Sequence, residues 1–515
     1  MRRFRVVTKH QVSGWRFLLR RIEHALVRRD TSMRDDPGRG RSTALTIGVA
    51  LACVIIAGAA VLAFFKPAKT VGNSRIVADK ETGALYVRVG ERLHPALNLT
   101  SARLIIGAAD KPVQVSRAEL EKYPRGPWVG IPGAPGSMVD TDNRESTWTV
   151  CDSTQTGAAA PVNPETGLPS STRSALRTTV IGGPLTLDSG AARELDVGEA
   201  RLLRDGTTNW LVYRDGARGV VRGEINLADT AVLLALGIDA TAPVLAASKG
   251  LIGAIPEVPP IRVPQVDGAG ETVTLTTGYT VPVGSVLAVH DAERPSGHYL
   301  VSKTGVVQIS SVLAAMIRNS DAHGTVTSRN VGPDLIAANL RPGGWPGTAA
   351  YPTRPIELVN PSSSGVTCYR WSRSGSDQTA ATTLLVGRRL PLTQEEQVRV
   401  VNLVTAPASR GKTADSAYLP RTTGRLVQVT GTDTASPLRE SLYWIADNGV
   451  RYGIEITDRG AEQTLRALGL RAPVAAPWSV VSLFAPGPSL SEGAARIQHD
   501  GIAPNTTGVG LGGPA

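Results

Sequence analysis

The hydrophobic pattern of the chain changes abruptly at residue 44. Residues 44–65 read ALTIGVALACVIIAGAAVLAFF and include no charged side chain. A helix of this length extends about 33 Å, enough for the roughly 30 Å hydrocarbon core of a bilayer. A signal peptide would have a shorter apolar stretch before a small-residue cleavage site. Because no second stretch reaches about 18 apolar residues, the pattern predicts a single-pass membrane protein with an uncleaved anchor.

A different pattern precedes this span. Between residues 11 and 29, apolar side chains recur at helical spacing, and arginines occupy much of the remaining helix surface. This pattern predicts a basic amphipathic helix that either lies on anionic lipid or docks on a partner protein. The residues expected to make the contact are Trp15, Arg16, Leu18, Leu19, Arg20, Arg21 and Ile22.

After the span, short apolar stretches alternate with turn residues, and several of them recur. Residues 209–216 (NWLVYRDG) resemble residues 441–449 (SLYWIADNG), and each stretch reads as a short strand that ends in a turn. Each is followed by a helix ending in Ala-Leu-Gly and then by Ala-Pro-Val. Weaker copies begin at Leu85 and His298. Self-similarity of this kind predicts repeated structural units.

A second pair of similar segments lies between these copies. Cys151 and Cys368 each precede a loop and a β-rich apolar strand. We therefore predict an α+β exported domain in which four repeats surround a central β-rich core with pseudo-two-fold symmetry. The predicted divisions are a basic cytoplasmic arm 1–43 with the helix 11–29, a transmembrane helix 44–65, repeat 1 at 74–138, core half 1 at 139–200, repeat 2 at 201–284, repeat 3 at 285–355, core half 2 at 356–420, repeat 4 at 421–495 and a disordered tail 496–515.

The distribution of charge predicts the topology. The 515 residues carry a formal net charge of +11. Residues 1–43 hold 12 Lys and Arg against 4 Asp and Glu, so this arm accounts for +8 and the rest of the chain for only +3. A body so close to neutral argues against nucleic acid as a partner. Since positive charge favours the cytoplasmic side, we expect a cytoplasmic N-terminus, a span in the inner (plasma) membrane and a periplasmic C-terminal domain.

Cysteine usage fits an exported domain. Cys53 lies inside the predicted span, whereas Cys151 and Cys368 are the two cysteines of the exported part. Two cysteines in an oxidising compartment favour one disulfide, although two separately buried thiols remain the alternative. The bond would close a loop of about 217 residues and contribute roughly 5 kcal/mol at most in the entropic model. It would also staple the two core halves together.

Residues that would carry chemistry are sparse. The exported part has no Gly-x-Ser-x-Gly elbow and no His-Glu-x-x-His motif, so we expect no catalytic residues and no metal site. One phosphate-loop-like stretch ends in Gly411, Lys412 and Thr413. Its first position is Ala406 instead of glycine, and Pro407 lacks the N–H that would turn toward phosphate. A surface loop without a cofactor is the preferred interpretation, and ATP binding is the alternative.

The N-terminal motif carries a family resemblance. Residues 8–21 (TKHQVSGWRFLLRR), followed by a single span, resemble the EccB family. EccB is the bitopic membrane component of the actinobacterial type VII (ESX) secretion system. Matches at His94-Pro95, Gly130–Pro135 and Val450–Gly453 extend the resemblance over nearly the whole chain.

The resemblance implies a structural core subunit of a secretion membrane complex. Its expected partners are EccC, EccD and EccE type components, and its exported domain would associate with itself. The family's repeats are similar to a cell-wall-binding phage lysin fold, which implies peptidoglycan contact. Some family members are described as ATPases, an activity with which Ala406 and Pro407 conflict here. The candidate functions are therefore a structural translocon subunit, an exported-side ATPase and a peptidoglycan-binding module.

Overall fold

The computed structural model divides the chain into two units, Met1–Thr70 and Val71–Ala515. The residues that the structure describes are 8–29, 38–64, 70–141, 143–154, 176–187, 192–276, 278–291, 294–320, 328–404, 412–420, 424–437, 439–456 and 461–502.

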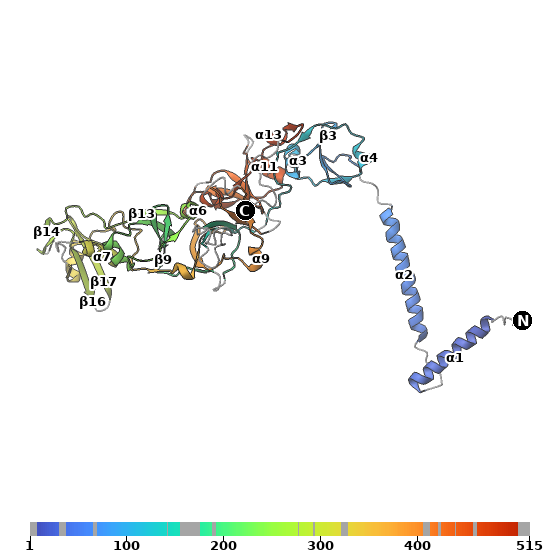
Figure 1. The fold of residues 1–515 in the computed structure, drawn as a ribbon, viewed down its shortest axis with the longest axis horizontal. Helices are drawn as coiled ribbons and strands as arrows, with labels where there is room; N and C mark the ends of the chain where they lie inside the picture. Colours follow the sequence, from blue (N-terminus) through green and yellow to red (C-terminus); the bar gives the residue numbers. More distant parts are fainter. Residues whose placement is uncertain are drawn as a thin grey trace, which may run out of the picture. The chain divides into compact units, whose positions relative to one another are not determined.

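The first unit contains two long helices, α1 (Lys9–Arg28) and α2 (Gly38–Phe64) (Figure 1). Helix α1 begins after Thr8, whose backbone N–H donates to Gln11 Oε1 at 3.1 Å. It ends at Arg29, which adopts the left-handed conformation with φ 57° and donates its N–H to the Ala25 carbonyl. Helix α2 spans 27 residues and includes the predicted membrane span except for Phe65, which lies outside the described residues.

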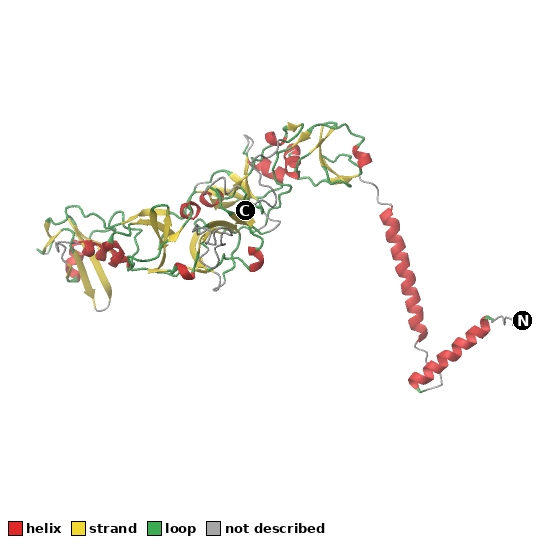
Figure 2. Ribbon diagram, in the orientation of Figure 1, coloured by secondary structure: helices red, strands yellow, loops and turns green. Residues whose placement is uncertain are grey.

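The second unit consists mostly of short strands joined by loops and short helices (Figure 2). Four of its sheets share one topology. In each, three consecutive strands form an antiparallel meander, a helix follows, and the next strand returns parallel to the first. A helix crossover is the usual way to connect parallel strands. The first sheet is built from β1 (Ile76–Asp79), β2 (Leu85–Val89), β3 (Arg92–Pro95), α3 (Leu99–Ile106) and β4 (Val113–Val115).

The other three sheets repeat this order along the chain. The second has β9 (Glu199–Asp205), β10 (Thr208–Asp215), β11 (Gly219–Ile225), α5 (Thr230–Leu236) and β12 (Leu245–Ala246). The third has β16 (Val286–Asp291), β17 (Arg294–Ser302), β18 (Gly305–Ile309), α7 (Ser311–Ser320) and β19 (Ser328–Asn330). The fourth has β25 (Arg425–Thr430), β26 (Leu442–Ile445), β27 (Val450–Ile454), α11 (Ala461–Leu468) and β28 (Val474–Pro477).

A second crossover closes the far edge of each sheet. Another short helix follows the returning strand, and the chain then pairs in parallel with the third strand of the meander. These helices are α4 (Arg117–Leu120), α6 (Lys249–Ala254), α8 (Pro333–Asn339) and α12 (Trp478–Val481). In the same order, the closing parallel pairs are Arg125 with Leu93, β13 (Glu257–Ile261) with β11, Leu340 with Val306, and β29 (Ala485–Pro486) with β27.

Glycine ends the crossover helices where the backbone turns left-handed. Gly107 and Gly237 cap α3 and α5 with φ 68° and 76°. Gly469, which follows α11 directly, has φ 73°. Glycine adopts this conformation without the steric cost of a Cβ, so the Ala-Leu-Gly stretches mark the ends of α5 and α11.

A seven-stranded sheet lies at the centre of this unit. Its order is β23-β24-β7-β6-β21-β22-β8. The middle pair is antiparallel, with Cys151 opposite Cys368 and Trp148 opposite Trp371. The strands are β6 (Ser146–Ser153), β7 (Arg177–Gly182), β8 (Ala192–Glu194), β21 (Val366–Arg373), β22 (Ala381–Gly387), β23 (Val401–Asn402) and β24 (Ser416–Tyr418).

Three hydrophobic clusters hold the sheets together. The largest joins the central sheet to the second and fourth sheets through residues such as Trp148, Leu251 and Phe484. Another joins the second and third sheets, where α5 packs against α7. A third joins the first and fourth sheets and includes Ile76 and Trp444. Each of the four sheets therefore completes its core with residues of another sheet.

The mixed α/β architecture agrees with the predicted fold class, while the pseudo-two-fold symmetry stays a prediction. Two boundaries differ from those expected. Residues 357–358 form β20 (Glu357–Leu358), which pairs with β9 of the second sheet instead of joining the central sheet. The predicted tail also begins too early, because β30 (Gln498–His499) pairs with β5 (Trp128–Val129). Residues 503–515 lie outside the described residues.

The smaller elements complete the unit. They are the hairpin β14 (Thr272–Thr274) and β15 (Thr280–Pro282), the 3-10 turn η1 (Pro361–Ser363), and the short helices α9 (Gln394–Gln397) and α13 (Glu492–Ala495).

Candidate functional site

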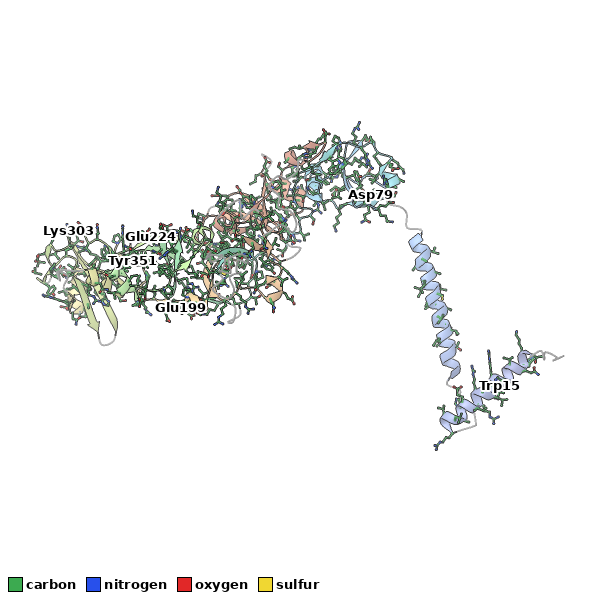
Figure 3. All side chains as sticks on the ribbon, viewed as in Figure 1. Trp15, Asp79, Glu199, Glu224, Lys303 and Tyr351 are labelled. Carbon is green, nitrogen blue, oxygen red and sulfur yellow. A yellow bond between two sulfur atoms is a disulfide. The ribbon has the colours of Figure 1, made fainter. Side chains whose placement is uncertain are left out.

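Helix α1 presents apolar side chains that no part of its unit covers. The seven residues predicted to dock on lipid or a partner all lie on this helix and are exposed. Trp15 is 64% exposed and Ile22 is 55% exposed, and Figure 3 shows Trp15 projecting from the helix. Apolar surface of this kind marks an interaction site more often than a solvated face. The geometry is compatible with either lipid or protein as the contact.

Helix α2 has the length and composition of a membrane span. Within the described parts of the chain, its segment Thr43–Val61 is the one stretch of helix long and apolar enough to cross a bilayer. None of this segment is buried in the structure, and Cys53 is exposed on it. The apolar surface is therefore available to lipid.

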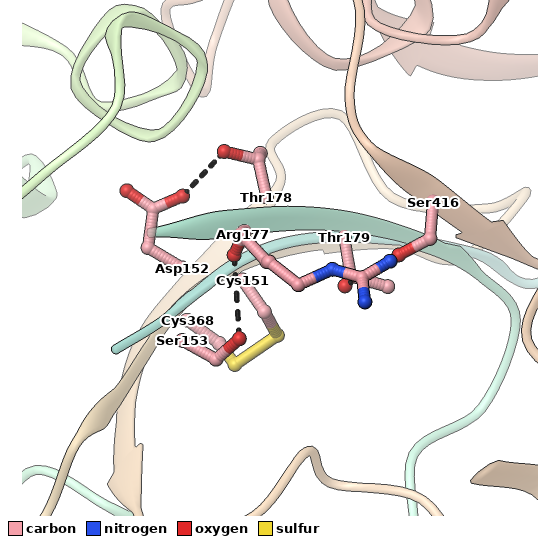
Figure 4. The surroundings of a disulfide bond; sticks show 8 residues. All are labelled: Cys151, Asp152, Ser153, Arg177, Thr178, Thr179, Cys368 and Ser416. Carbon is pink, nitrogen blue, oxygen red and sulfur yellow. Dashed lines mark hydrogen bonds between the residues drawn. A yellow bond between two sulfur atoms is a disulfide. The ribbon is translucent and has the colours of Figure 1, made fainter. Parts of the chain in front are cut away.

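The two cysteines of the second unit form a disulfide at the middle of the central sheet. Cys151 on β6 and Cys368 on β21 are bonded to each other, 217 residues apart in the chain, and both are fully buried (Figure 4). A small apolar cluster covers the bond, with Ile181, Leu385 and Tyr418 among its members. The disulfide therefore connects the two segments that the sequence assigned to the halves of the core.

A buried carboxylate lies beside the disulfide. Asp152 is only 2% exposed. Its Oδ1 accepts hydrogen bonds from the hydroxyls of Thr178 and Ser248, both at 2.8 Å, and its Oδ2 accepts one from the Ser248 N–H at 2.6 Å. Figure 4 shows the bond to Thr178. Burial raises the pKa of Asp152 to about 6, although these hydrogen bonds act in the opposite direction. Because Ser248 also caps α6, the carboxylate links the central sheet to the second sheet.

A buried arginine makes a second link between these sheets. Arg201 on β9 is 1% exposed. Its Nη1 donates to Ser364 Oγ at 2.8 Å and to the Val359 carbonyl at 3.1 Å, its Nη2 donates to the Ser364 carbonyl, and its Nε donates to Thr367 Oγ1 at 3.2 Å. All of these partners are neutral, and burial lowers the pKa of Arg201 to about 10. The arginine thus fixes β9 to the start of β21.

The phosphate-loop-like stretch continues into a strand. Gly411 lies outside the described residues, Lys412 is exposed, and Thr413 is partly buried. Residues 412–415 form a bend that leads directly into β24. A phosphate loop normally ends at the start of a helix, whose first N–H groups face the phosphates. ATP binding at Lys412 and Thr413 stays a prediction that this local geometry does not favour.

Comparison with known proteins identifies the family. Residues 4–504 match the family model described as "Type VII secretion system ESX-1, transport TM domain B". The chain belongs to the EccB family. It is 40% identical to the "ESX-3 secretion system ATPase EccB3" of Mycolicibacterium smegmatis, over 97% of this chain and 92% of that protein. It is 36% identical to the "ESX-1 secretion system ATPase EccB1" of Mycobacterium tuberculosis, over 96% and 95% of the two chains.

Chains from solved structures of ESX complexes have the same fold. A chain of an intact ESX-5 inner membrane complex matches with a TM-score of 0.73 and 33% identity, over 99% of both chains. A chain of an EccB3 dimer from the ESX-3 core complex matches with a TM-score of 0.69 and 37% identity, over 82% of this chain and all of that one. The family resemblance of the N-terminal motif is thereby confirmed.

Proposed function

We propose that this chain is a structural core subunit of a type VII secretion inner-membrane complex. The match along 99% of its length to a chain of the ESX-5 inner membrane complex carries the proposal. The exposed apolar helix α2 supports an anchoring role, and the large β-rich unit supports a contribution to the periplasmic part. The charge of +8 on residues 1–43 supports a cytoplasmic N-terminus and a periplasmic C-terminal unit.

The partners follow from the family and from α1. EccC, EccD and EccE type components are the proposed neighbours in the complex, and the exposed apolar face of α1 is the proposed docking site for one of them. Self-association through the exported unit is supported by the dimer reported for an EccB3 protein. The pseudo-two-fold arrangement of four repeats is part of the same proposal, supported by the register of β6 and β21 and the common topology of the four sheets.

A triple variant of α1 tests the structural role. Trp15→Ala, Leu19→Ala and Ile22→Ala together remove apolar surface from the docking face while leaving the charge of the arm unchanged. We expect the chain to leave the large complex on a blue-native gel of solubilised membranes, and export of secreted proteins to stop. Phe17→Ala with Val27→Ala is the matched control, because these side chains are 56% and 80% exposed, lie outside the predicted docking set and are not three or four positions from Trp15, Leu19 or Ile22. A triple variant that still migrates with the complex and supports export would disprove the docking role.

An exported-side ATPase is the second candidate, supported by the names of the EccB3 and EccB1 relatives. In this chain the activity would depend on Lys412, whose exposed side chain is free to reach a nucleotide. Lys412→Ala should then abolish phosphate release by the purified chain, whereas Lys249→Ala, a lysine of α6, should not. Equal rates in the wild type and the Lys412→Ala variant would exclude this role for the lysine.

Peptidoglycan binding remains a third proposal, based on the family resemblance of the repeats. Co-sedimentation of the purified chain with isolated peptidoglycan tests it directly. The chain should appear in the pellet at low detergent and moderate salt, with bovine serum albumin as the non-binding reference. Recovery of the chain entirely in the supernatant would contradict the proposal.

A further inference from the structure

Three arginines meet in a cavity between the central sheet and the fourth sheet. The cavity has a volume of about 260 Å³. The segment before β6, the turn after β21, the loop before β26 and strand β28 all contribute to its wall. Its charged lining residues are Arg144, Arg373, Arg439 and Asp377, and its other polar lining includes Ser376, Gln378 and Gln428. Three positive groups against one negative group give the wall an excess of positive charge.

Backbone carbonyls hold two of these guanidinium groups in place. Arg144 Nη1 donates to the Ala472 carbonyl at 2.7 Å, and Arg373 Nε donates to the Asp377 carbonyl at 2.8 Å. A guanidinium has five N–H donors, so each side chain is oriented by one bond and keeps further donors for a ligand. Arg439 is exposed. Over residues 70–502, wherever the structure describes the chain, none of the three forms an ion pair with a carboxylate.

A fourth arginine, Arg425, lies beside this cavity. Arg425 lies close to Arg144 and is fixed by the carbonyls of Asn143, at 2.8 Å, and Glu145. Burial lowers the pKa of Arg425, Asp140 acts in the opposite direction, and the positive charge of Arg144 lowers it further. Two arginines are therefore near neighbours at this junction, and one of them has part of its water shell removed.

An adjoining cavity has a different charge balance. It has a volume of about 430 Å³ and shares Arg373, Ser374 and Asp377 with the first cavity. Its second arginine, Arg370, is already paired with Glu194 at 2.6 Å, and Glu145 adds a negative group to its wall. Of the two adjoining cavities, the one at Arg144, Arg373 and Arg439 therefore has the excess of positive charge.

We propose that this cavity binds an oxyanion, the carboxylate or phosphate group of a ligand. Planar guanidinium groups match the two oxygens of either anion and form charge-assisted hydrogen bonds with it. Two of the groups are already oriented, so less conformational entropy is lost on binding. Because the wall comes from both the central and the fourth sheet, a bound anion would connect the two. The proposal does not depend on the proposed function, since it rests only on the charge and geometry of this cavity.

Titration calorimetry of the full-length chain in detergent tests the site, with inorganic phosphate and succinate as separate probes at constant ionic strength. We expect saturable binding of at least one probe at one site per chain. The probe with the lower Kd identifies the source of the oxyanion as phosphate or carboxylate. Each charge-assisted hydrogen bond lost should weaken binding about tenfold or more. Arg144→Gln and Arg373→Gln should therefore each raise the Kd by at least that factor.

Two further variants make the result decisive. Arg439→Gln changes an exposed side chain without a hydrogen bond in the described residues, so it should fold normally and still weaken binding. Arg466→Gln is the matched control on α11, where the arginine pairs with Glu462 at 3.0 Å outside the cavity, and it should bind as the wild type does. The proposal fails if neither probe gives saturable heat, or if Arg439→Gln binds as tightly as the wild type.

Discussion

Replacing Asp152 with asparagine should change how the stability of the second unit depends on pH. The pKa of this carboxyl is raised to about 6 in the fold, against about 3.9 in an unfolded chain. Between these values the folded state binds more protons than the unfolded state, so stability falls as pH rises from about 4 to about 6. A shift of about two units corresponds to about 3 kcal/mol lost by pH 7, an order-of-magnitude figure.

Asparagine imitates the uncharged carboxyl and therefore removes this loss. Its amide nitrogen cannot accept the hydrogen bond that Ser248 N–H donates to Asp152 Oδ2, which costs about 1 kcal/mol. We expect Asp152→Asn to be more stable than the wild type by about 2 kcal/mol at pH 7 and less stable by about 1 kcal/mol at pH 4. The two stability curves should cross between these pH values.

Urea unfolding of the full-length chain in detergent, followed by tryptophan fluorescence at several pH values, measures this difference. The buried Trp148 and Trp371 on the central sheet are suitable reporters. Asp239→Asn is the opposite control, because hydrogen bonds from Thr241 lower the pKa of this exposed carboxyl. The stabilising contribution of the Asp239 carboxylate should be present at neutral pH and be lost as pH falls. Parallel curves for the wild type and Asp152→Asn from pH 4 to pH 8 would refute the reasoning.

Two further predictions concern the links between sheets. Cys368→Ser should lower the free energy of unfolding by about 2–5 kcal/mol because the 217-residue loop is no longer closed, whereas Cys53→Ser should leave this free energy unchanged. Non-reducing peptide mapping of the wild type should find Cys151 and Cys368 linked. Two free thiols at these positions would contradict the structure. Arg201→Met should lower the free energy of unfolding by about 3 kcal/mol because Ser364 and Thr367 lose their buried donor. Arg204→Met, at an exposed position of the same strand, should change this free energy little. Equal urea midpoints for the two arginine variants would show that Arg201 does not connect the sheets.

Local patterns predicted the elements that depend on neighbouring residues. The uncharged stretch at 44–65 and the amphipathic spacing at 11–29 correspond to α2 and α1, since helix periodicity is a short-range property. The Asp-Gly and Asn-Gly turns likewise separate β10 from β11 and β26 from β27. These features require no knowledge of distant partners.

Long-range pairing was harder to predict. Glu357–Leu358 reads as part of the core segment, but its parallel pairing with β9 involves residues more than a hundred positions away. The same holds for Gln498–His499, which completes a two-stranded sheet with Trp128–Val129. Short strands carry little pattern of their own, so only their partners reveal them.

The burial of charged side chains also could not be predicted from the sequence. Arg201 stands in a strand among apolar residues, where an arginine usually points to solvent. Its burial depends on carbonyl and hydroxyl acceptors from residues 359–367, which nothing near position 201 predicts. The three arginines of the proposed oxyanion cavity, at positions 144, 373 and 439, are likewise far apart in the sequence. Charge counts showed that the part of the chain after the span is nearly neutral, but not which of its positive groups come together.

The disulfide has a consequence for the integrity of the chain. The second and third sheets lie in sequence between Cys151 and Cys368, so the bond closes them into a covalent ring. A single peptide-bond cut between residues 152 and 367 would open the ring without releasing either fragment. A cut between α2 and β1 would instead separate the whole second unit from α2. A cut within the ring therefore leaves every part of the second unit covalently joined to α2, whereas a cut before β1 leaves none of it joined.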